Sequence, residues 1–142
     1  MVRTTALLIA GLSLALAACS PPRQAETPAT TAETAVSLAN VSSPVSGARV
    51  TTPVIVEGAA PGDWFFEAQF PVKLVAADGT VLAEAPARAQ GEWVTEAHVA
   101  YRAELVFIVT GETQATLVLQ EDMPADNANP REVTMPVVLA PR

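Results

Sequence analysis

Short apolar runs, bounded by proline, glycine and aspartate, begin near residue 37 and continue to the C-terminus. The clearest alternation lies in residues 101–109, where Tyr101, Ala103, Leu105, Phe107 and Val109 share one parity. Because successive side chains of a strand point to opposite faces, this pattern predicts a strand with one buried face. The other runs cover residues 54–56, 72–76, 80–82, 117–119 and 133–139.

The runs predict about seven strands in roughly a hundred residues, and none of them shows a sustained helical period. Asp78 and Gly79 stand between two runs and predict a hairpin with a primed turn, which needs residues that tolerate positive φ. Gly58 follows residues 54–56, and we expect it to adopt positive φ in a turn there. The pattern therefore favours an all-β sandwich over residues 37–142, large enough to fold without disulfides or metal.

The first eighteen residues carry a different pattern. Arg3 precedes an apolar run, residues 6–18, which ends at Cys19. As a helix this run would span only ~20 Å, short of the ~30 Å hydrocarbon core of a bilayer. The positive residue, the short apolar core and the small residues after it predict that residues 1–18 form a signal peptide.

The end of this run resembles the lipobox of bacterial lipoproteins, with Leu16, Ala17 and Ala18 before Cys19. In such proteins the cysteine thiol accepts diacylglycerol, and small residues let the preceding bond enter a peptidase. The chain has one cysteine, so a thioether there would leave no thiol for a disulfide. We expect an exported lipoprotein of the cell envelope, attached to the membrane through the lipid on Cys19. An ordinary secretory signal with a chance cysteine is the alternative.

Two further expectations follow from the residues after the cysteine. Ser20, in place of aspartate, resembles the pattern of lipoproteins sent to the outer membrane, where the chain would sit on the periplasmic face in a Gram-negative host. Residues 19–36 comprise the lipidated cysteine and a stretch rich in proline, threonine and alanine with almost nothing to bury. This composition predicts a flexible tether with a reach of ~20–25 Å.

The sandwich region resembles the immunoglobulin-like domain of bacterial spore germination and sporulation proteins. The matching stretches are a Ser-Pro, a glycine and a Pro-led strand in residues 43–58, the closing Gly-Ala-Ala of residues 58–60, residues 66–74, the turn and strand of residues 78–82, and the Gly-Glu-Trp of residues 91–93. The resemblance extends from about residue 38 to about residue 139. It implies an immunoglobulin-like fold, frequent occurrence in envelope lipoproteins and no known catalytic residues, but not that the host forms spores.

Charge and composition narrow the function classes. The formal net charge is −7, from 15 acidic and 8 basic residues, which argues against nucleic acid as a partner and against docking of the domain surface on anionic lipid. His98 is the only histidine, so neither a zinc site nor a histidine triad has its parts. The acidic and amide residues of residues 121–131 lack the spacing of a calcium-binding hand and favour ordinary turns. We therefore expect no metal, no cofactor and no enzymatic activity.

The aromatic run Trp64, Phe65 and Phe66 is the main candidate for recognition. If the run is extended, it cannot be wholly buried on one face. One interpretation places Phe65 in the core with Trp64 and Phe66 at an edge, or the reverse. The other makes Trp64 and Phe66, together with Trp93, an exposed platform for a partner protein or a sugar ring.

The function we expect is a non-catalytic protein-binding or accessory module that contacts an envelope protein through a strand edge or loops. The alternative is a wall-glycan-binding domain that uses Trp64 or Trp93.

Overall fold

The computed structural model describes residues 38–122 and 129–142, which form eight strands and one short 3₁₀-helix. The strands are β1 (Asn40–Ser43), β2 (Arg49–Thr51), β3 (Val54–Pro61), β4 (Gln69–Ala76), β5 (Val81–Ala89), β6 (His98–Leu105), β7 (Thr113–Gln120) and β8 (Glu132–Ala140), and the helix is η1 (Gly62–Trp64). The all-β prediction is confirmed, with eight strands instead of about seven. The predicted signal peptide, the lipobox with Cys19 and the tether lie outside the described residues.

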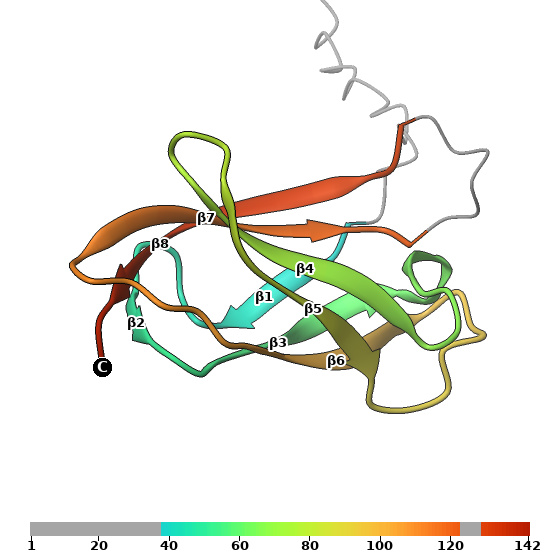
Figure 1. The fold of residues 1–142 in the computed structure, drawn as a ribbon. Coiled ribbons are helices and arrows are strands. Elements are labelled where there is room, and N and C mark those ends of the chain that lie inside the picture. Colours follow the sequence, from blue (N-terminus) through green and yellow to red (C-terminus); the bar gives the residue numbers. More distant parts are fainter. Residues whose placement is uncertain (1–37, 123–128) are drawn as a thin grey trace, which may run out of the picture. The chain divides into compact units, whose positions relative to one another are not determined.

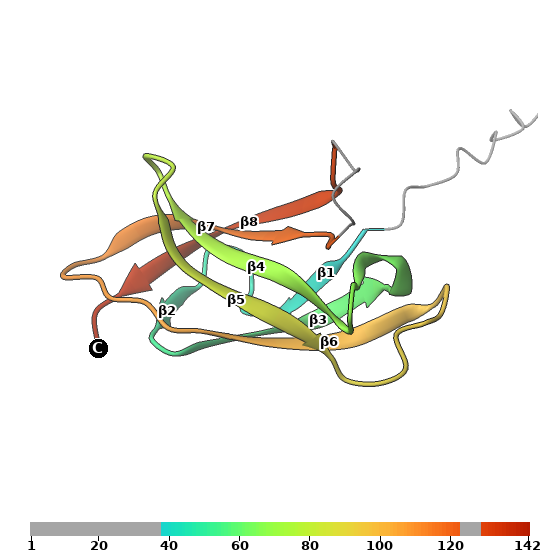
Figure 2. The same cartoon turned by 45° about the vertical axis from the view of Figure 1, so that its right-hand side comes forward.

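The strands follow the order β1-β3-β6-β5-β4-β7-β8-β2, and every pair is antiparallel except β2 with β8. The sheet folds over, so that β1, β3 and β6 form one layer and β4, β7 and β8 the other (Figures 1 and 2). β5 connects the layers. It pairs with β4 along nearly its whole length but with β6 only through Arg88↔Arg102 and Ala89↔Tyr101.

The core fills the space between the two layers with side chains of alternating strand positions. In β6 and the segment after it, Tyr101, Ala103, Leu105 and Phe107 are at most 2% exposed, as their shared parity predicts. Phe70 of β4 lies at the centre, with the rings of Trp64, Phe65 and Tyr101 edge-on to it at centroid distances of 5.8, 5.1 and 5.0 Å. Edge-to-face packing of this kind stabilises aromatic cores beyond the area that it buries.

The hairpin between β4 and β5 occurs where predicted, but its turn is not a primed one. Only Gly79 adopts positive φ (87°), and Ala76 accepts a hydrogen bond from Gly79 N–H and donates one to Thr80 O. This is the three-residue loop that ends in a left-handed glycine. The Thr80 N–H group donates to Asp78 Oδ1 (2.9 Å) and thereby lowers the pKa of that exposed carboxyl.

The expectation of positive φ at Gly58 is wrong, because this residue lies inside β3, opposite Tyr101 of β6. A glycine is needed there for a different reason. A Cβ atom on Gly58 would lie 2.0 Å from the carbonyl oxygen of Asn40 and 2.8 Å from the Tyr101 hydroxyl. Close approach of β1, rather than backbone conformation, excludes a side chain at this position.

Candidate functional site

The aromatic run is not extended, and this changes which of its rings are exposed. Gly62–Trp64 form the helix η1, which breaks the alternation of a strand and turns Trp64 (0% exposed) and Phe65 (4% exposed) into the core. Phe66 is 47% exposed. The exposed platform predicted for Trp64 is therefore wrong, because a buried indole offers no face to a ligand.

Phe66 lies at the start of a tight turn that the sequence does not predict. Its N–H and C=O groups exchange hydrogen bonds with Gln69 at 2.9 and 3.1 Å, and the two residues between them, Glu67 and Ala68, adopt φ of 51° and 63°. Positive φ at both central positions is the geometry of a type I′ turn, which usually contains asparagine and glycine. Glu-Ala at these positions carries no such sequence signal.

Trp93 lies in the loop between β5 and β6 and is half-buried against the core. The carbonyl oxygens of Trp93 and Thr95 stand so close to Gly62 that a Cβ atom there would be 2.6 and 1.9 Å from them. This loop therefore packs directly on η1. With Trp64 inside the core, the three aromatic residues do not form one exposed surface.

A charged cluster lies beside Trp64, and the sequence analysis did not predict it. Arg131 forms ion pairs with Glu121, which is 5% exposed, and with Asp63, and its guanidinium carbon lies 5.6 Å from the Trp64 ring centroid. Burial alone would lower the pKa of Arg131, but hydrogen bonds to Glu121 and Asp63 and the negative charge of both raise it overall. The cluster anchors both ends of the chain segment that joins β7 to β8.

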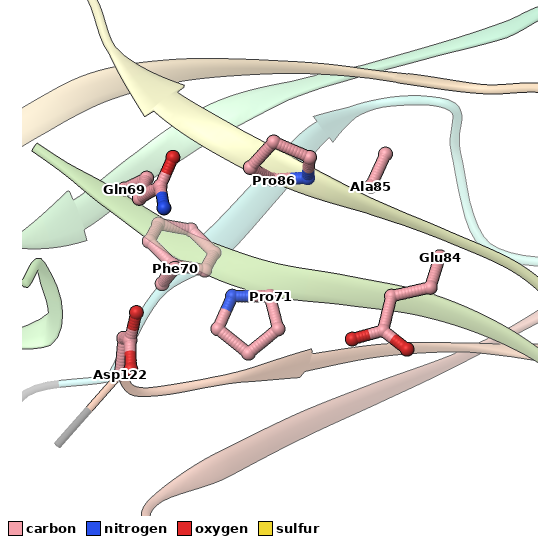
Figure 3. A pocket seen from close by; sticks show the side chains of 7 residues that line it. All are labelled: Gln69, Phe70, Pro71, Glu84, Ala85, Pro86 and Asp122. Atoms are coloured by element: carbon pink, nitrogen blue, oxygen red, sulfur yellow. The ribbon is translucent and has the colours of Figure 1, made fainter.

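A shallow hollow with a volume of about 410 Å³ opens on the outer side of β4 and β5 (Figure 3). Pro71 and Pro86, which face each other across the two strands, are among the residues that line it. The carboxylates of Glu84 and Asp122 lie on opposite sides of Pro71. The hollow thus combines apolar lining residues with two acidic groups, which suits an apolar segment that carries a cationic side chain.

A second hollow, of about 310 Å³, lies on the other side of β5, at the point where this strand leaves β6. Ala85 and Pro86 line both hollows, and Arg102, Ala103 and Glu104 line the second from β6. Arg102 forms an ion pair with Glu57 of β3. The surface around β5 is therefore hollowed on both sides, with the exposed Pro86 shared by the two hollows and charged groups on either side.

Within residues 38–122 and 129–142, no three His, Cys, Asp or Glu side chains stand together as metal ligands. His98 is exposed, with Nε2 3.2 Å from the carbonyl oxygen of Leu38. Asp126 and Asn127, two of the residues weighed for calcium, lie outside the described residues. None of the helices in the described part of the chain is long and apolar enough to cross a membrane.

Comparison with known proteins identifies the family of the domain. The comparison with curated proteins found no match, and the comparison with solved structures found none either. Residues 38–128 match a family described as the immunoglobulin-like domain of bacterial spore germination. The match ends before β8, eleven residues short of the residue 139 that the resemblance was expected to reach. Because it nevertheless covers more than half of the chain, the protein belongs to the family of the immunoglobulin-like domain of bacterial spore germination, Gmad2.

Proposed function

We propose that this protein is a lipoprotein of the cell envelope, anchored by a lipid on Cys19, whose immunoglobulin-like domain binds another envelope protein without catalysing a reaction. The observation that carries the proposal is the surface around β5, where two hollows share the exposed Pro86 and where residues 81–87 pair with no strand on the β6 side. Surfaces of this kind recognise extended protein segments through backbone hydrogen bonds and apolar contacts.

The chemistry of the same surface supports binding rather than catalysis. The polar side chains that line the larger hollow are Gln69, Glu84 and Asp122, and no serine, threonine, cysteine or histidine accompanies them. A nucleophile with an adjacent general base, which hydrolases need, is thus not assembled there. The description of the matched family, an immunoglobulin-like domain, names no reaction.

The alternative that the ligand is a wall glycan lacks the exposed tryptophan on which it depended. That alternative relied on stacking of a sugar ring on Trp64 or Trp93, but Trp64 is fully buried and Trp93 is half-buried. Sugar recognition by stacking needs an accessible aromatic face. We therefore propose a protein as the principal partner.

The experiment is photo-crosslinking of the full-length chain in intact cells, with the reactive residue placed in turn at Lys73, Glu104 and Val94. These positions sample the outer side of β4, the edge of β6 and the loop before β6. Recovery of one dominant protein from at least one position, identified by mass spectrometry, supports the proposal. Recovery of wall-glycan fragments without a protein would overturn it in favour of the glycan alternative.

A further inference from the structure

In the described part of the chain, β5 and β6 leave an open seam, defined as the space between residues 81–87 of β5 and residues 103–109 of β6 and the segment that follows it. The described ladder between these strands ends at Arg88↔Arg102 and Ala89↔Tyr101. Beyond that point the two strands separate, as both views of the ribbon show (Figures 1 and 2). The smaller hollow lies at the closed end of this seam.

Main-chain groups of β6 point into the seam. Gln90 N–H donates to Ala100 O across the ladder, whereas Phe107 N–H donates to Thr52 Oγ1 on the opposite side. Because residues of a strand direct their N–H and C=O groups alternately to the two sides, Glu104 and Val106 share the side of Ala100. No described strand pairs with them there.

The exposure of side chains indicates that this extended edge continues past the end of β6. Val106 (67% exposed) and Ile108 (91% exposed) point outward, while Phe107 (2% exposed) points into the core. Val81, at the start of β5, is 51% exposed. Three of the seven exposed large hydrophobic residues in the described part of the chain thus border one seam.

The two sides of the seam differ in how readily they can pair with an added strand. On β5, Ala89 N–H donates to Ala68 O on the β4 side. Pro86 has the opposite parity, so its backbone faces the seam, and proline has no N–H group to donate there. A proline at an edge position and an irregular register near Val81 both hinder the addition of a strand. Residues 103–109 contain no proline or lysine and present apolar side chains. Only the β6 side is therefore ready to accept a strand.

We propose that the β6 side of the seam binds an extended segment of the partner protein as an added β-strand, with a basic residue next to Glu104 and apolar residues next to Val106 and Ile108. The backbone edge requires an extended main chain. Glu104 is exposed and stands opposite Ile55 of β3, so no cation faces it across that pair. Arg102, two residues away, is neutralised by Glu57. The net charge of −7 favours a basic partner over a second copy of the chain.

The inference rests on the proposed function and names the surface that performs it. The test uses the full-length chain in detergent micelles and, as a probe, a ten-residue peptide with blocked ends, in which one face of the extended chain carries a lysine and two valines at consecutive positions and the other face carries threonine. Hydrogen exchange is followed by mass spectrometry with fragmentation to single residues. We expect the amides of Glu104 and Val106 to exchange at least tenfold more slowly when the peptide is bound. A matched peptide with N-methyl groups on its pairing edge should give no protection.

Two double variants make the test specific to the seam. Val106→Lys with Ile108→Lys places positive charge on the proposed edge, and the peptide should bind at least tenfold more weakly. Val45→Lys with Val94→Lys adds the same charge at residues of similar exposure (68% and 72%) elsewhere, and binding should be unchanged. Neither variant changes a buried side chain, so both should fold.

Several outcomes would overturn the inference. These are protection at β1 or β2 instead of residues 103–109, equal binding of the N-methylated peptide, equal weakening by both variants, and protection of the edge without peptide through association of two copies. A protein captured in cells from Lys73 or Val94 but not from Glu104 would also overturn it, while leaving the proposed function intact.

Discussion

Gly58 shows how a single residue limits the approach of two strands. Because its missing Cβ leaves room for the carbonyl oxygen of Asn40, we expect Gly58→Ala to force β1 away from β3 and to lower the free energy of unfolding by about 2 kcal/mol or more. Chemical denaturation measures the change. Gly91→Ala is the matched control, since nothing lies within 4 Å of its Cβ position and its φ is not positive. Equal stability of the two variants would contradict the steric explanation.

Tyr101 links the core to β1 through its hydroxyl group. It is 1% exposed and donates a hydrogen bond to Asn40 O at 2.8 Å, and burial raises its pKa well above the usual range. The folded state therefore keeps the proton that the unfolded state loses near pH 10. The stability due to this group is complete below about pH 10 and is lost as the pH rises toward the higher folded pKa.

The chain has one tyrosine, which makes this behaviour measurable. Absorbance of tyrosinate at ~295 nm should appear only as the domain unfolds in alkali. Tyr101→Phe should cost about 1 kcal/mol at neutral pH through loss of the hydrogen bond, and its free energy of unfolding should fall less steeply above pH 10 than that of the unaltered chain. Reversible ionisation near pH 10 in the folded domain would show that the phenol is accessible.

At the scale of elements, alternation with a period of two residues predicted strands and their buried faces reliably. The parity of residues 101–107 identified the buried face of β6 correctly, because burial of one face imposes that alternation. The aromatic run at residues 64–66 was not predictable in this way, since η1 replaces the two-residue period by a turn and buries neighbouring side chains together. The pairing of β2 with β8 also depends on contacts between distant segments, which local sequence does not encode.

The connection between β7 and β8 depends on a contact of the same long-range kind. Arg131→Met removes the guanidinium from Glu121, whose side chain is 4% exposed, and we expect a loss of about 3 kcal/mol in the free energy of unfolding. Combining it with Glu121→Gln should cost less than the sum of the single changes, because the buried charge is removed with its partner. Chemical denaturation of the three variants gives the coupling directly.

An exposed ion pair provides the comparison for this prediction. Arg49 pairs with Glu112, and their side chains are 60% and 58% exposed, so Arg49→Met should change stability by less than about 1 kcal/mol. Similar losses for Arg49→Met and Arg131→Met would mean that burial of Glu121 does not determine the strength of its pair.

At the scale of the whole molecule, the described domain has two ends with different surroundings. The chain enters β1 from Leu38 at the end that also carries η1 and the loop before β6, where Trp93 lies (Figures 1 and 2). The hairpin between β4 and β5 and the C-terminus lie at the opposite end, toward which the seam opens. A segment added at the β6 edge would therefore lie toward the hairpin end of the domain, opposite the end at which the chain enters β1.

The proposed membrane attachment depends on the anchor at Cys19, which one substitution tests. Because the cysteine thiol is the only group in the chain that can form the thioether, Cys19→Ser should abolish lipid attachment and leave the chain unprocessed or released. Intact-mass measurement and partition into detergent after phase separation report the lipid and the loss of membrane attachment. Ser20→Ala keeps the thiol and should remain lipidated. A Cys19→Ser chain that still carried the lipid and stayed in the membrane fraction would refute the anchor on Cys19.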